Sequence, residues 1–275
     1  MSEYYVQKEN KDSKYRLKCW EIATGLQKID GLTPSNYLYE LANKHINNEC
    51  TINEVEEKIK QYYENETLED IADRKKEADL VTAKITDLLN DNSFTFSPEM
   101  LKHIHKVLFE DIYDHAGKFR ECNIKKSEPI LHGETVNYAN YQMIYEIYKY
   151  DFMQEKEYKY SNKPPKEIVD NISKFTSSIW QVHPFMEGNT RTTAVFLEKY
   201  LNTVGFNVNN DLFKENALYF RNALVRSNYA NYQKGIDTEN IYLERFFENL
   251  LFNGKHILQN RDMIIKQNIN KDYER

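Results

Sequence analysis

The sequence predicts an all-α fold, a helical bundle interrupted by one short β-hairpin. Apolar residues recur every three or four positions along most of the chain, which is the stripe of a helix with one buried face. Only eight glycines and six prolines interrupt its 275 residues. Residues 120–138 are the exception, because they show strand-like alternation around Asn123-Ile124 and Thr135-Val136, with Pro129 and Gly133 between. We interpret this segment as the hairpin.

The N-terminal quarter of the chain predicts three short helices. The first carries Trp20, Ala23 and Leu26 on one face. Two more follow between residues 35 and 65, and the segment Thr51-Ile52-Asn53-Glu54 fits a capping box at the start of the second. We assign residues 1–66 to an N-terminal helical region.

Residues 67–255 are expected to form the main domain. One helical stripe runs from Leu68 to Leu89, and another runs from Leu101 to Ile112 after the start signal Ser97-Pro98-Glu99. Two prolines at the end of segment 161–165 predict a loop inside this domain. Residues 256–275 are expected to complete the chain as a helical tail.

One nonapeptide, His183-Pro184-Phe185-Met186-Glu187-Gly188-Asn189-Thr190-Arg191, concentrates the chemistry of the chain. The helix before it should end at His183, because the residue before a proline is disfavoured in the α conformation. A second apolar stripe, from Val195 to Val204, predicts that a new helix begins near Gly188. The first turn of that helix has unpaired N–H groups and a positive dipole, so it favours a phosphate.

The side chains of this nonapeptide suit a nucleotide site. Arg191 offers a planar, permanently charged fork that matches phosphate oxygens. Glu187 offers a hard oxygen ligand for Mg²⁺ held together with a nucleotide, and His183 can accept a proton near neutral pH. Each residue alone is more often a helix cap or solvated surface, and Phe185 suits a core anchor. Their conjunction indicates a nucleotide site.

The nonapeptide resembles the signature His-x-Phe-x-Asp/Glu-Gly-Asn-x-Arg of the Fic (filamentation induced by cAMP) family. The segment Ile112–Arg120 is similar to a second Fic motif, Tyr-x-x-Ala-Gly-x-x-Arg, and the likeness runs from about Phe94 to about Leu251. The resemblance implies a protein adenylyltransferase. In such enzymes the histidine deprotonates a hydroxyl group of a target protein, the oxygen attacks the α-phosphate of ATP, AMP is transferred and pyrophosphate leaves.

Carried over residue by residue, the resemblance makes His183 the general base, Glu187 the Mg²⁺ ligand and Arg191 a phosphate clamp. The anion cradle would consist of Gly188, Asn189 and Thr190. The resemblance further implies ATP as the substrate and Mg²⁺ as the cofactor. The partner of the enzyme would be a target protein that the sequence does not identify. The enzyme would also modify itself.

Two segments outside the nonapeptide also receive roles from the resemblance. In Fic enzymes the hairpin, called the flap, pairs with an extended target segment by strand addition. Ile130 and Leu131 near its tip would press on the target side chain. A later helix shapes the adenine pocket, and Asn222 and Tyr229 are its candidate contacts. From the residues alone, an ordinary surface hairpin and tyrosines packed in the core remain alternatives.

Two positions depart from the Fic pattern. Thr190 stands where many members have glycine, and Ala194 stands where they have a second arginine, which usually engages the terminal phosphate. Without that arginine we expect a looser hold on the γ-phosphate, by about 1 to 3 kcal/mol unless another cation replaces it.

The N-terminal helices resemble the VbhA-like antitoxin module that restrains Fic toxins, here fused ahead of its partner. In the family, inhibition depends on a helix with the pattern Ser/Thr-x-x-x-Glu-Gly/Asn. The glutamate of this helix pairs with the second arginine of the Fic motif. The nearest match runs from Leu26 to Gly31 and is degenerate, with Asp30 at the glutamate position. Because Ala194 also removes the arginine, both halves of the salt bridge are expected to be missing. We therefore expect no tight salt-bridge inhibition.

Composition argues against several other classes of protein. A net charge of −6 with interspersed acidic and basic residues does not suit a nucleic-acid surface. Neither a signal peptide nor a long apolar run is found, so a cytoplasmic protein without a membrane anchor is expected. The three cysteines lie far apart and are expected to stay reduced. His103 and His105 face different sides of a helix, which disfavours a shared metal.

Two classes of function remain open at this point. The first is the protein adenylyltransferase, with transfer of another nucleotide or removal of AMP as variants of the same site. The second is a regulatory protein that binds a nucleotide with little turnover, which the changes at Thr190 and Ala194 favour. The sequence leaves both a monomer and a homo-oligomer open.

Overall fold

The fold consists of helices joined by irregular loops in the part of the chain that the computed structural model describes, which is residues 12–64, 70–206, 208 and 212–266. Ten α-helices and five short 3₁₀ turns form in these residues, and no strand does. The all-α prediction is therefore confirmed, whereas the expected hairpin is not seen in residues 120–138. None of the described helices is both long and apolar enough to cross a lipid bilayer.

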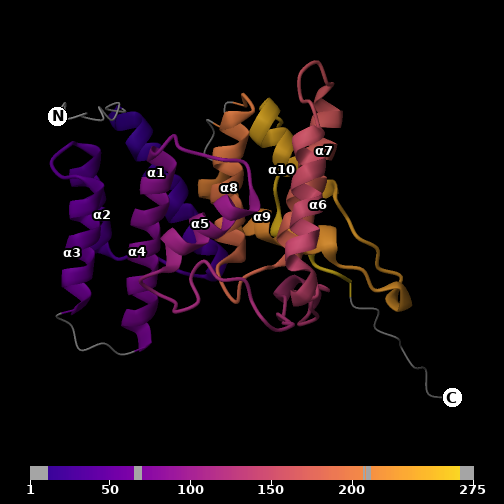
Figure 1. Cartoon of the computed structure of the whole chain (residues 1–275), viewed down its shortest axis with the longest axis horizontal. Helices are drawn as coiled ribbons and strands as arrows, with labels where there is room; N and C mark the ends of the chain where they lie inside the picture. Colours follow the sequence, from indigo (N-terminus) through magenta and orange to yellow (C-terminus); the bar gives the residue numbers. More distant parts are fainter. Residues whose placement is uncertain (1–11, 65–69, 207, 209–211, 267–275) are drawn as a thin grey trace, which may run out of the picture.

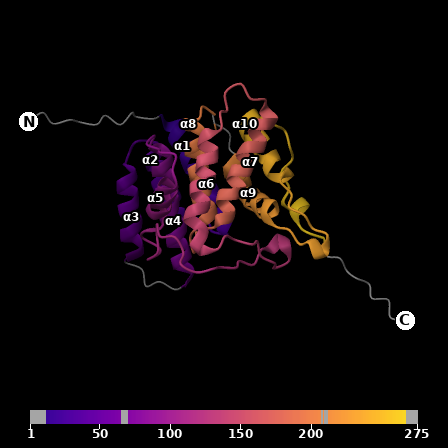
Figure 2. The same ribbon diagram turned by 45° about the vertical axis from the view of Figure 1, so that its right-hand side comes forward.

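Two groups of helices lie toward opposite ends of the molecule in Figure 1, and the turned view in Figure 2 keeps this order. Helices α2 and α3 form one end, and α6, α7 and α10 lie toward the other, with α8 between them. The helices are α1 (Ser13–Gln27), α2 (Asn36–Ile46), α3 (Ile52–Glu64), α4 (Asp70–Asn90), α5 (Pro98–Phe109), α6 (Ile144–Glu157), α7 (Pro165–Val182), α8 (Asn189–Thr203), α9 (Leu212–Asn228) and α10 (Ile241–Phe252).

Local start signals in the sequence are confirmed. The backbone N–H of Thr51 donates to Glu54 Oε2 at 2.7 Å, and the N–H of Glu54 donates to Thr51 Oγ1 at 3.2 Å, which together make the expected capping box. Ser97 likewise accepts from the N–H of Met100 at the start of α5. Because these signals are local, the sequence predicts such helix starts within one or two residues.

Helix α8 is the central element of the bundle. Every residue from Asn189 to Leu201 is buried, and α8 contacts α1, α4, α5 and α7. A helix buried on all sides is expected to be apolar all round. Here α8 instead contains Arg191, Glu198 and Lys199, so these charged side chains must find partners inside the protein.

Helix α1 is embedded between the two parts of the molecule. Cys19, Ile22, Ala23 and Leu26 join the main core, whereas Trp20 packs into a second cluster with side chains of α2, α3 and α4. A Cβ on Gly25 would lie 2.4 Å from the Cα of Lys214, so only glycine allows α1 to cross α9 this closely. The first helix of the N-terminal region is therefore also part of the main core.

A buried carboxylate joins α2 and α3 to α4. Asp79 on α4 accepts hydrogen bonds from the Ser35 N–H at 2.7 Å, the Ser35 hydroxyl at 2.5 Å and the Tyr63 hydroxyl at 2.8 Å. Burial raises the pKa of Asp79, and the hydrogen bonds from Ser35 and Tyr63 oppose that rise.

The C-terminal segment differs from the expected helical tail. Residues 256–266 contain only the 3₁₀ turn Asn260–Met263, and residues 267–275 lie outside the described part. Asn253 ends α10 in the left-handed conformation, with φ of 53°. The chain then runs back along the molecule, where the N–H of Ile265 donates to the carbonyl of Ile130 at 3.0 Å. This hydrogen bond joins the end of the segment to the loop at Ile130.

We predict that Asp79→Ala lowers the free energy of unfolding by about 2 to 4 kcal/mol, because it leaves the buried Ser35 and Tyr63 donors without their acceptor. Urea denaturation followed by circular dichroism measures this change. Asp73→Ala, which removes an exposed carboxylate of the same helix, serves as the control and should change stability by less than about 0.5 kcal/mol. Equal effects of the two substitutions would contradict the proposed linking role.

Candidate active site

The nonapeptide forms the predicted elbow between α7 and α8. Helix α7 ends at Val182, and His183 adopts the left-handed conformation with φ of 48°. The guanidinium of Arg120 donates to the carbonyls of His183 at 2.8 Å and of Val182 at 3.2 Å, and the N–H of Arg120 donates to Pro184 at 2.7 Å. Arg120 thus satisfies the carbonyl groups that are left unpaired where α7 ends.

Three residues shape the loop at the start of α8. Gly188 has φ of 75°, and a Cβ there would lie 2.3 Å from the ring of Phe109, so only glycine fits. The side chain of Asn189 accepts from the Phe185 N–H at 2.9 Å and donates to the Phe185 carbonyl at 2.8 Å. Thr190 accepts from the indole N–H of Trp180 at 2.9 Å. The side chains of the predicted cradle therefore fix the loop, and its backbone N–H groups are the part suited to an anion.

The side chain of His105 supports the loop that precedes α8. The sequence does not reveal this role. Its Nδ1 accepts from the N–H of Gly117 at 2.8 Å, so Nε2 carries the proton and donates to the carbonyl of Glu187 at 3.0 Å. Its ring stacks on Phe185 with centroids 3.7 Å apart. Burial lowers the pKa of His105 to about 4, so the ring is neutral at physiological pH.

His183 lies in an aromatic pocket and is only 4% exposed. The ring of Tyr138 stacks on it with centroids 4.0 Å apart, and Trp180 meets it edge-on at 5.2 Å. Burial, and then the charge of Lys126, lower the pKa of His183 to about 3. Among the described residues, no hydrogen-bond partner reaches its Nδ1. The imidazole is therefore neutral and able to accept a proton.

Glu187 is exposed on the loop and faces Lys126, whose Nζ lies 3.5 Å from Glu187 Oε2. In the described part of the chain, no three histidine, cysteine, aspartate or glutamate residues gather closely enough to hold a metal. Mg²⁺ in nucleotide sites is commonly held by one or two carboxylates together with the phosphates. The single carboxylate of Glu187 fits that arrangement, and it does not fit a metal held by protein groups alone.

Arg191 is buried and paired on three sides, which corrects one expectation from the sequence. Its Nε lies 2.8 Å from Asp30 Oδ2, its Nη2 lies 2.6 Å from Glu77 Oε1, and its Nη1 donates to Gln27 Oε1 at 3.1 Å. The expectation that Asp30 lacks an arginine partner is wrong. Asp30 uses Arg191 instead of the missing arginine at position 194, and Glu77 on α4 adds a second carboxylate.

Gly31 follows Asp30 and provides the left-handed turn at the end of the 3₁₀ helix Lys28–Asp30, with φ of 66°. This turn ends the helical path of α1 just after the aspartate. The degenerate inhibitory motif predicted at Asp30 and Gly31 is therefore in contact with the nonapeptide, because Asp30 pairs with Arg191.

The segment expected to be a flap is a loop with a buried tip. Ile130 is 6% exposed and Leu131 is fully buried, within the 3₁₀ turn Pro129–Leu131. A role in pressing on a target side chain does not fit this burial. The alternation in the sequence reflects side chains that point into the core from a loop, in which the Glu128 N–H donates to the Glu134 carbonyl at 2.9 Å.

A buried ion pair connects this loop to α9 and to His183. Glu128 is fully buried, and its Oε2 lies 2.7 Å from Arg221 Nη2. The hydroxyl of Tyr138, whose ring stacks on His183, donates to Glu128 Oε1 at 3.4 Å. Sequence patterns missed this pair, because its members lie in an irregular loop and a distant helix.

Asn222 and Tyr229, the predicted adenine contacts, are buried and bonded within the protein. Asn222 Nδ2 donates to Asn260 Oδ1 at 2.8 Å, and the Tyr229 hydroxyl donates to Glu134 Oε2 at 2.5 Å. These bonds match the core-packing alternative, and contact with adenine stays a prediction.

A neutral buried histidine, His183, and an exposed carboxylate, that of Glu187, thus lie on one elbow between two helices of an all-α domain. Residues 95–201 match the Fic/DOC family. The chain thus contains a Fic/DOC domain, and the resemblance of the nonapeptide to that family is confirmed.

Two curated proteins are similar in sequence. Protein adenylyltransferase VbhT of Bartonella schoenbuchensis is 25% identical over 178 residues, which cover 64% of this chain and 33% of VbhT. The probable protein adenylyltransferase y4lH of Sinorhizobium fredii is 28% identical over 125 residues, which cover 45% of this chain and 61% of y4lH. The match therefore spans about a third of the first relative and three fifths of the second.

One solved structure has a similar fold. The N-terminal FIC domain of Bep8, a VirB-translocated effector from Bartonella sp. 1-1C, superposes with a TM-score of 0.52 at 18% identity. The match covers 68% of this chain and 88% of the other. At this identity the comparison supports the helical fold and nothing more.

We predict that His105 and His183 stay neutral between pH 8 and pH 5. Their folded pKa values lie below the unfolded value near 6.5, so the unfolded chain binds more protons as the pH falls from about 6.5 to 4. The two histidines should therefore lower the free energy of unfolding as the pH falls through that range. NMR titration of labelled histidine, with His183→Ala to assign its signals, measures both. A midpoint at pH 6 or above for either ring would contradict its burial as described.

Proposed function

We propose that this protein transfers AMP from ATP to a hydroxyl group of a target protein, and also to itself. The observation that carries the proposal is the neutral, buried His183, which lies at the elbow of a Fic/DOC domain four residues before the exposed carboxylate of Glu187. The printed names of both sequence relatives include protein adenylyltransferase, which supports the same reaction class.

His183 would act as the general base. It takes the proton of the target hydroxyl while the oxygen forms a bond to the α-phosphorus of ATP. The bond from that phosphorus to the bridging oxygen breaks, and pyrophosphate leaves. With a pKa of about 3 the free imidazole is a weak base. Because burial and the positive charge of Lys126 cause this low value, negative phosphates beside His183 would raise its pKa toward a useful range.

Glu187 would hold Mg²⁺ together with the phosphates, and the ion when bound would neutralise phosphate charge. To do so, Glu187 must first release Lys126. The freed ammonium group then faces the same phosphates and supplies a positive charge that the sequence lacks at Ala194. Phosphoryl transfer depends mainly on positioning and charge neutralisation, so this exchange of partners would serve the reaction.

The anion cradle would be formed by the backbone N–H groups of Gly188, Asn189 and Thr190 at the start of α8. Arg191 would act as a phosphate clamp only after leaving Asp30 and Glu77. We infer that the N-terminal region, through Asp30, restrains the site in this way together with Glu77 of α4, as an antitoxin-like region would. The exposed residues of segment 121–127, in place of Ile130 and Leu131, would bind the target.

A nucleotide-binding regulator with little turnover is the second candidate. It is favoured by the state of the described site, in which Arg191 is fully engaged and Tyr138 stacks on His183. Such a protein would bind ATP without forming a covalent product.

We predict that ATP labelled on the α-phosphate, with Mg²⁺, labels the protein and that His183→Ala lowers the rate by at least a hundredfold, because the general base is lost. Autoradiography of the denatured protein measures the bound label. His103→Ala removes an exposed histidine of α5 and should keep the rate of the unaltered protein. Saturable ATP binding without any label would favour the regulator instead.

We also predict that the double variant Asp30→Asn with Glu77→Gln binds ATP at least tenfold more tightly and transfers AMP faster. The amides keep hydrogen-bond acceptors beside Arg191 but remove the two charges that compete with phosphate. Isothermal titration calorimetry gives the affinity, and thermal unfolding checks that the fold is kept. Asp73→Asn on α4 is the control. If the double variant folds and its affinity for ATP is unchanged, Arg191 has a structural role only.

A further inference from the structure

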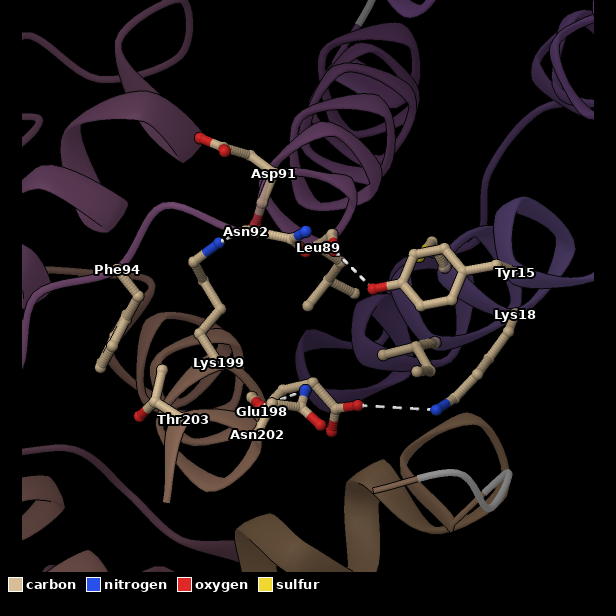
Figure 3. A pocket seen from close by; sticks show the side chains of 12 residues that line it. Tyr15, Lys18, Leu89, Asp91, Asn92, Phe94, Glu198, Lys199, Asn202 and Thr203 are labelled. Atoms are coloured by element: carbon tan, nitrogen blue, oxygen red, sulfur yellow. Dashed lines mark hydrogen bonds and ion pairs between the residues drawn. The ribbon is translucent and has the colours of Figure 1, made fainter. Parts of the chain in front are cut away.

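A cavity of about 410 Å³ lies between α1 and α8, at the end of α8 away from the nonapeptide (Figure 3). Its walls come from α1, from the end of α4 with the chain that follows, and from the last two turns of α8. It is lined by Tyr15, Lys18, Cys19, Ile22, Leu89, Asp91, Asn92, Phe94, Glu198, Lys199, Asn202 and Thr203. None of these residues takes part in the proposed transfer of AMP.

Glu198 is the unusual group in this wall. Its side chain is 6% exposed, and its Oε1 lies 4.0 Å from Lys18 Nζ, the limit of an ion pair. Its Oε2 is buried, and no donor in the described part of the chain reaches it. Burial raises the pKa of Glu198 to about 7, and the charge of Lys18 opposes that rise. A buried carboxylate oxygen without a donor favours any ligand that brings one.

The other polar groups around the cavity are directed to protein partners. Lys199 Nζ donates to the carbonyls of Leu88 and Asp91, at 2.6 Å each. The Tyr15 hydroxyl donates to the Leu89 carbonyl at 2.9 Å. Lys18 Nζ also donates to the carbonyl of Val208. Compared with these groups, Glu198 still has a carboxylate oxygen that can accept a hydrogen bond from a ligand.

The remaining surface suits an apolar body. Ile22 and Leu89 are aliphatic, and Phe94 and the ring of Tyr15 are aromatic. The cavity has the size of a small-ligand site, in which apolar walls and one or two polar groups are usual. We propose that it binds a small organic cation, whose amine or amidine group donates to Glu198 while its apolar part packs between Ile22, Leu89 and Phe94.

The cavity lies between the same two helices that meet at Arg191. Glu198 follows Arg191 by seven residues, about two helical turns, so both lie on one face of α8. On α1, Lys18 lines the cavity and Gln27 bonds to Arg191. A ligand between α1 and α8 would therefore change the packing of the two helices that hold Arg191. The binding itself does not depend on catalysis.

Benzamidine is a suitable probe, because it joins an amidinium to a phenyl ring. At pH 8, where most of the Glu198 carboxyl is ionised, calorimetry should give saturable binding of benzamidine. Benzamide, which is neutral, and benzoate, which is anionic, should bind at least tenfold more weakly. Glu198→Gln should weaken benzamidine binding at least tenfold, whereas Glu146→Gln, an exposed glutamate on α6, should leave it unchanged. Methyl NMR of the unaltered protein should show shifts at Ile22 and Leu89.

Four outcomes would overturn the proposal. They are no saturable binding of benzamidine, equal binding of benzamide, tighter binding of benzoate, and unchanged affinity in a folded Glu198→Gln variant. If that variant does not fold, the NMR shifts decide, because binding elsewhere would leave the methyl signals of Ile22 and Leu89 unmoved.

Discussion

The burial of one permanent charge, that of Arg191, determines how three helices meet. An unpaired guanidinium inside a protein is costly, so its neighbours must supply acceptors and negative charge. Gln27 is the last residue of α1, Asp30 lies in the 3₁₀ turn that follows, and Glu77 comes from α4. Helices α1 and α4 are thereby held against α8, and the N-terminal helices become part of the surroundings of the nonapeptide.

The shape of the nonapeptide depends equally on partners far away in the chain. Arg120 satisfies the carbonyl of His183, 63 residues later, and His105 satisfies that of Glu187, 82 residues later. Gly188 allows the close approach of Phe109. The loop is therefore positioned by contacts with distant parts of the chain rather than by its own sequence, and these contacts fix the places of His183 and Glu187.

Local patterns predicted much of this structure. The capping box at Thr51 and the proline after His183 act within a few residues, and both marked their elements correctly. Long-range pairs could not be predicted in this way. Glu77 meets Arg191 across 114 residues, and no pattern in α4 distinguishes it from a glutamate that faces solvent. Alternation around Asn123-Ile124 and Thr135-Val136 was equally ambiguous, since a loop pinned to the core and a paired strand can share it.

The segment 120–138 contributes Tyr138 over the ring of His183 and Lys126 beside Glu187. A movement of the Lys126 and Tyr138 side chains, with Arg120 kept in place against the elbow, would uncover His183 and the carboxylate of Glu187 together. A reaction at this loop would then include an opening step that precedes proton transfer, and its turnover number could report the speed of that motion instead of the chemistry. Under the proposed function, a target that moves these two side chains aside would accelerate its own modification, so recognition and rate would be set by the same movement.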